Sequence, residues 1–71
     1  MGLEEAKVQY KRALSSLLYS CGLGDLNAIE DSVKTLDAAV CDFGLAAARE
    51  ARDTGLPHTE AKIKRLLGSR P

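Results

Sequence analysis

The stretch LNAIEDSVKTLDAAVCDFGLAA, residues 26–47, carries the strongest structural signal in the chain. Its apolar residues recur at alternating steps of three and four, which is a heptad pattern and predicts a long helix with one apolar side. We expect that side to face a neighbouring helix. The positions concerned are Leu26, Ile29, Val33, Leu36, Val40, Phe43 and Ala47.

Within this stretch, Asp42-Phe43-Gly44 matches three letters of the protein-kinase activation segment, in which the aspartate holds magnesium. A kinase also needs a glycine-rich loop, a strand lysine and an HRD-type loop, none of which is present in the 71 residues. We therefore interpret Phe43, like Val40, as a core residue of the helix. Asp42 is then a side chain beside the core and not a metal ligand.

An earlier helix is predicted by a second stripe of the same kind. Its residues are Leu3, Ala6, Tyr10, Ala13 and Leu17, widened by Leu14, Leu18 and Cys21. Residues 4–18, EEAKVQYKRALSSLL, resemble the second helix of a tetratricopeptide repeat, with small, aromatic and small residues at positions 6, 10 and 13. The resemblance implies one amphipathic helix, because no 34-residue period follows.

Glycine and cap residues mark the expected helix ends. Gly22 suits the left-handed position after the first helix, and Asp25 suits the N-cap of the second. Gly55 ends the second helix, and a third begins at Pro57 or Thr59 and reaches Leu67. The sequence therefore predicts one domain, with a helical hairpin in residues 1–56 and a short basic helix and tail in residues 57–71.

A short turn between two long helices predicts an antiparallel hairpin. With the turn near residues 23–25, Tyr10 is expected near residues 36–38, Lys7 near Asp42, and Lys11 near Asp37. The apolar stripes are wider than one hairpin can cover. The predicted fold class is therefore all-α, with two hairpins associating as a coiled-coil-like homodimer, a four-helix bundle.

Composition restricts the class of protein. Apolar residues make up 45% and charged residues 28% of the chain, and no apolar run approaches the roughly 20 residues that span a bilayer. The acidic N-terminus does not match a signal peptide, so we expect a cytoplasmic protein. A chain of this size builds only a marginal core, which favours stabilisation by self-association or by a partner.

The residues that could carry chemistry are few and scattered. Cys21 and Cys41 would lie roughly 20 Å apart along the hairpin, which is too far for a disulfide, and we expect them as buried reduced thiols. Together with His58 they lack the paired spacing of a zinc site. No catalytic, cofactor or metal site is predicted, and the protein is expected not to be an enzyme.

Charge is the remaining signal. Residues 57–71 carry Lys62, Lys64, Arg65 and Arg70 against Glu60, so the tail is +3 and residues 1–56 are −3. We expect a regulator or inhibitor that binds another protein; a nucleic-acid-binding regulator that uses the basic tail is the alternative, and a structural assembly subunit is the third possibility. The expected partner-binding residues are Val8, Tyr19, Lys62, Ile63, Lys64, Arg65, Leu66 and Leu67.

Overall fold

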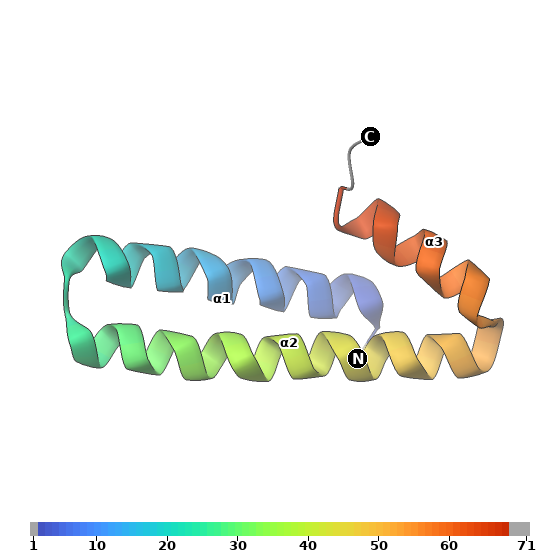
Figure 1. The fold of residues 1–71 in the computed structure, drawn as a ribbon, viewed down its shortest axis with the longest axis horizontal. Helices are drawn as coiled ribbons and strands as arrows, with labels where there is room; N and C mark the ends of the chain where they lie inside the picture. The colour runs from blue at the N-terminus through green and yellow to red at the C-terminus, as the bar shows by residue number, and fades with distance from the viewer. Residues whose placement is uncertain (1, 69–71) are drawn as a thin grey trace.

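The computed structural model describes residues 2–68, and these form three helices and no strands: α1 (Leu3–Leu23), α2 (Leu26–Thr54) and α3 (Leu56–Leu66). α1 and α2 run antiparallel as a hairpin, and α3 turns back from the end of α2 toward the start of α1 (Figure 1). The predicted all-α class and the hairpin are confirmed. α3 lies only at the open end of the hairpin, so no third helix covers the end that holds the α1–α2 turn (Figure 1).

Local side-chain and backbone chemistry sets the helix ends. Asp25 is the N-cap of α2 as predicted, because its Oδ1 accepts hydrogen bonds from the backbone N–H groups of Asn27 at 3.0 Å and Ala28 at 3.4 Å. The predicted end of α1 at Gly22 is wrong. α1 continues to Leu23, and the left-handed residue is Gly24, with φ 73°.

The junction between α2 and α3 is shorter than predicted. Gly55 alone separates the two helices, and its φ of 103° is one that residues with a side chain rarely adopt. α3 begins at Leu56, one residue before the expected Pro57. His58 therefore lies in the first turn of α3, where it is exposed, and not in a linker.

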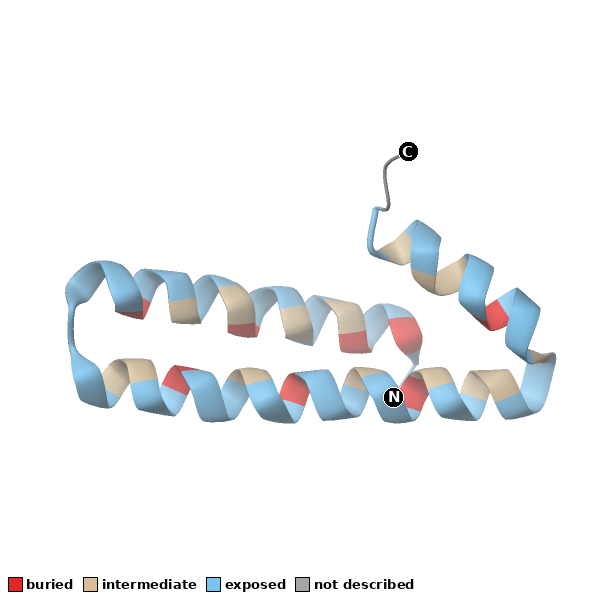
Figure 2. Cartoon of the chain, viewed as in Figure 1, coloured by how far each residue is buried: buried red, intermediate tan, exposed pale blue. Residues whose placement is uncertain are grey.

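The seam between α1 and α2 consists of small residues that recur at every seventh position of each helix. All of them are buried, and Figure 2 shows the buried positions on the facing sides of the two helices. Small side chains allow two helix backbones to approach closely, which favours many weak contacts between the backbones. The seam residues are Ala6, Ala13 and Ser20 of α1 and Ser32, Ala39 and Ala46 of α2.

A hydrogen bond across the seam sets the register of the hairpin. The Ser20 and Ser32 hydroxyl groups lie 2.9 Å apart and bond to each other. Ser20 Oγ also donates to the Ser16 carbonyl at 3.0 Å, so Ser32 is the hydroxyl that depends on this bond. A buried hydroxyl without a partner costs about 1–3 kcal/mol, so Ser32 disfavours any register that separates it from Ser20. Counting back along α1 and forward along α2 from this pair places Ala13 opposite Ala39 and Ala6 opposite Ala46.

The register expected from the turn position is therefore wrong by about one helical turn. Tyr10 packs against Phe43 and not against residues 36–38; the ring centroids lie 6.4 Å apart with 62° between the ring planes. Among residues 2–68, the expected pairs of Lys7 with Asp42 and of Lys11 with Asp37 do not form. The buried seam outweighs exposed ion pairs, which contribute little to stability.

The predicted apolar seam of α2 is also partly wrong. Leu26 is 79% exposed, Val33 40% and Val40 50%, so Val40 is not a core residue. Phe43 is half-buried, as are Ile29 and Leu36. The same steps of three and four are met by a second series that keeps every large half-buried residue and replaces Val33, Val40 and Ala47 with the small buried residue before each. That series is Ile29, Ser32, Leu36, Ala39, Phe43 and Ala46.

Enlarging a seam residue should force the helices apart. We expect Ala39→Leu, at a position only 6% exposed, to lower the free energy of unfolding by about 1–3 kcal/mol through overpacking. Urea denaturation followed by circular dichroism measures this change. Ala38→Leu, at the exposed neighbouring position, should leave the stability nearly unchanged; equal losses in both variants would contradict the small-residue seam.

Candidate interaction surface

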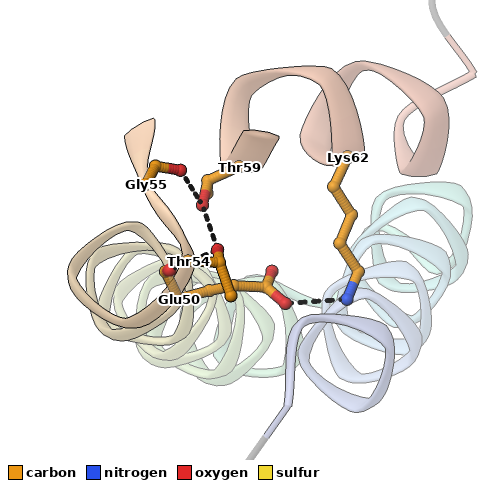
Figure 3. A network of polar contacts seen from close by, with 5 residues as sticks. All are labelled: Glu50, Thr54, Gly55, Thr59 and Lys62. Carbon is orange, nitrogen blue, oxygen red and sulfur yellow. Dashed lines mark hydrogen bonds and ion pairs between the residues drawn. The ribbon is translucent and has the colours of Figure 1, made fainter. Parts of the chain in front are cut away.

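A polar cluster attaches α3 to the hairpin. Thr59 is 1% exposed, and its hydroxyl donates to the Gly55 carbonyl at 3.1 Å and lies 3.5 Å from the Thr54 hydroxyl (Figure 3). One helical turn further along α3, Lys62 Nζ donates to Glu50 Oε1 of α2 at 2.8 Å (Figure 3). These contacts hold α3 across the open end of the hairpin.

The ion pair between Lys62 and Glu50 is the main electrostatic feature of the cluster. The hydrogen bond to Glu50 raises the pKa of Lys62 above its ordinary value, because the carboxylate stabilises the ammonium form, while desolvation opposes this effect. The second carboxylate oxygen, Glu50 Oε2, is buried and has no hydrogen-bond partner. That oxygen makes the docking of α3 less favourable than the ion pair alone suggests.

Apolar contacts between α3 and the hairpin are limited to one small cluster. Ile63 and Leu66 are half-buried and pack against the buried residues Leu3, Ala6 and Ala46 at the open end. Leu67, directly after α3, remains 55% exposed. α3 therefore covers one end of the hairpin and leaves the rest of the same side open.

The uncovered side of the hairpin is apolar. We call it the apolar face and define it by Tyr10, Leu14, Leu17, Leu18, Ile29, Val33, Leu36, Val40 and Phe43. A groove of about 340 Å³ marks its boundary with α3 and is lined by Tyr10, Val40, Phe43, Gly44 and Leu67. Leu18 is 65% exposed and Val40 50%, although both are large apolar residues.

The opposite flank of the seam, which we call the polar flank, has no large apolar side chain in its groove. That groove is lined by Gln9, Arg12, Ser16, Thr35 and Asp42 together with Ala13, Ala38 and Ala39. The groove beside α3 is thus lined mostly by large apolar side chains, whereas the groove on the opposite flank is lined by polar side chains and alanines.

The predicted partner-binding residues do not lie together. Val8 and Tyr19 are exposed, at 48% and 71%, but neither is on the apolar face. Tyr19 follows Arg12 of the polar flank by seven residues, and Val8 lies two residues beyond Ala6 and so points away from the seam. Of the predicted apolar anchors, only Leu67 lines the groove beside Val40.

The predicted basic residues are also divided. Lys64 and Arg65 are exposed, whereas Lys62 is held by Glu50. A polar groove of about 370 Å³ between α1 and α3 is lined by Glu4, Lys7, His58, Lys62, Arg65 and Leu66. Lys7 contributes to this groove although it belongs to α1, and Arg70 lies outside the described residues.

Sequence reasoning missed most of the apolar face, because it assigned Val33 and Val40 to the seam. The sequence predicts that Leu14 and Leu18 stay exposed to solvent in a single hairpin. Leu18 is exposed, whereas Leu14 is half-buried. The signal that could have located the face is the seven-residue repeat of small residues in both helices. Those repeats mark the seam, and the large residues beside them then define the apolar face.

Both cysteines are free and exposed, so the expectation of buried thiols is wrong. Cys41 follows Lys34 by seven residues on the outer side of α2, away from the seam. Residues 2–68 contain no group of three side chains arranged to hold a metal ion. No helix in the described part of the chain is long and apolar enough to cross a membrane.

Comparison of the chain with models of protein families, with curated proteins and with solved structures gives no match. The function proposed below is therefore inferred from the residues and their geometry alone.

Removing the ion pair should loosen α3 selectively. We expect Lys62→Met to increase hydrogen exchange in residues 56–66 several-fold and to leave exchange across the α1–α2 seam unchanged, because the Glu50 carboxylate would lose the ion pair that joins it to α3. Exchange monitored by mass spectrometry measures this effect. Lys64→Met is the matched control, since Lys64 is exposed; comparable loosening by both variants would show that the ion pair does not hold α3.

Proposed function

We propose that this chain is a small, non-enzymatic protein–protein interaction module: a homodimer of helical hairpins that regulates or inhibits another protein by binding it. The observation that carries the proposal is the apolar face, a continuous set of large apolar side chains beside a seam of small residues. Exposed apolar surface of this extent is typical of interaction sites.

The internal core supports self-association. The only buried apolar residues among those described are Leu3, Ala6, Ala13, Ala39 and Ala46, four of which are alanine. Fully burying a valine or leucine side chain contributes about 1.5–3 kcal/mol, so the large residues of the apolar face hold more stabilisation than the seam supplies. A partner helix on that face would enlarge the marginal core that a chain of 71 residues builds alone.

The type of surface is what supports the regulatory role in this proposal. An apolar stripe along two adjacent helices can accept an amphipathic helix. The apolar side chains of the incoming helix, spaced three and four residues apart, then act as anchors. The same chemistry serves a second copy of the chain and a different protein. A module of this kind acts by occupying a helix-binding surface of its target.

Nucleic-acid binding is the second candidate function, and the groove that Lys7 shares with Arg65 favours it. Two observations make nucleic-acid binding the weaker of the two candidate functions. Glu50 neutralises Lys62, and Glu4 lies in the same groove. We expect no salt-sensitive binding of duplex DNA in a mobility-shift assay; tight binding that is lost when Lys62, Lys64, Arg65 and Arg70 are neutralised would reverse this order.

Self-association tests the main proposal. We expect sedimentation equilibrium at micromolar concentration to show at least a dimer, and Val40→Glu to shift it strongly toward monomer, because a charge would be placed in the interface. Val8→Glu is the control at a similarly exposed valine away from the apolar face, and it should remain associated. A wild-type chain that is a stable, folded monomer would contradict the proposal.

A further inference from the structure

We propose that the apolar face is occupied by a second copy of this chain, in an antiparallel arrangement that places the α1–α2 turn of each copy against the end of α3 of the other. The inference rests on the self-association proposed above and assigns its orientation and register. It follows from where the apolar face begins, where it ends and how its residues are spaced.

α3 defines one boundary of the available surface. It covers the open end of the hairpin through Ile63 and Leu66, and the groove beyond it begins at Leu67, Tyr10 and Phe43. The other boundary is the turn at Gly24, where α1 ends and α2 begins. The uncovered stretch therefore runs from about residue 10 to the turn on α1, and from the turn to about residue 43 on α2.

The apolar residues of the face are arranged symmetrically about the middle of that stretch. On α1 the midpoint lies between Leu14 and Leu18, and on α2 it lies between Val33 and Val40. A two-fold axis through the midpoint, perpendicular to the helices, brings Leu14 of one copy opposite Leu18 of the other. The same axis brings Val33 opposite Val40, so one surface is complementary to itself, as a two-fold interface requires.

The ends of the stretch also match under this operation. The turn of one copy, with Leu23 62% exposed and Leu26 79% exposed, meets the exposed Leu67 after α3 of the other copy. Lys7 and Lys11 line the groove next to Leu67, where the second copy presents Asp25. Apolar and charged groups are thus complementary at both ends.

The opposite orientation is disfavoured by α3. A two-fold axis parallel to the helices would bring the two open ends together, so both α3 helices would compete for the same side of the hairpin at the same end. In the antiparallel arrangement the two α3 helices lie at opposite ends of the dimer, and neither has to move.

The surface is large enough for a specific dimer. About 14 residues of helix at 1.5 Å per residue, two helices wide, give an uncovered face of roughly 20 by 20 Å. Side-chain relief and the contacts at the two ends raise the accessible area above this projection. Two copies then bury on the order of 1,000 Å² in total, which is the size at which specific interfaces begin.

A cysteine placed next to the two-fold axis tests the arrangement. Leu36 lies on the apolar face at the middle of the stretch and is seven residues before Phe43, which lines the groove. In a chain with Cys21→Ser and Cys41→Ser, we expect Leu36→Cys to form a disulfide-linked dimer on mild oxidation, because the two-fold axis passes beside this position and brings the two Cα atoms within the roughly 7 Å that a disulfide needs. Non-reducing electrophoresis measures the product.

Asp42→Cys in the same background is the matched control, because Asp42 lines the polar flank. It should stay uncrosslinked, and circular dichroism should show that both variants fold. Crosslinking through position 42, or through neither position, overturns the antiparallel arrangement. Sedimentation of the reduced variants separates the two proposals: a dimer that fails to crosslink at position 36 contradicts the antiparallel arrangement alone, whereas a monomer contradicts both proposals.

Discussion

The close packing of α1 against α2 along the small-residue seam is the constraint on which the other features of the chain depend. Alanine and serine at every seventh position bring the two backbones together, and the hydrogen bond between Ser20 and Ser32 selects one register. Sliding the helices by one turn would bury these hydroxyl groups without each other as partners. The seam therefore determines which residues are opposite one another along the hairpin.

This packing has a consequence for the large apolar residues. A seam of small side chains has no room for leucine or phenylalanine, so those residues lie beside it and concentrate on one flank. The rings of Tyr10 and Phe43 pack against each other there, but the side chains of Leu18 and Val40 remain at least half exposed to solvent. The burial of the large residues on this flank therefore stays incomplete within residues 2–68.

α3 limits how much of that surface is available. It is joined to α2 by a single glycine with a positive φ and is held by one ion pair, one buried threonine and a small apolar cluster. This attachment is modest, but it fixes where the apolar face ends. In the antiparallel arrangement proposed above, this short helix of 11 residues sets the orientation of the dimer although it contributes little to the core.

Several features follow from local chemistry and could be predicted from the sequence alone. They are the helical content, the N-cap at Asp25, the end of α2 at Gly55 and the hairpin. Periodicity could not distinguish two helix faces one position apart, because both the series through Val33 and Val40 and the series through Ser32 and Ala39 obey the same steps. Hydrophobicity favoured the first series, whereas the closest backbone approach requires the second. Register, exposure and the apolar face therefore depend on how two helices pack in space, and that packing balances side-chain volume against buried hydrogen bonds across the whole seam.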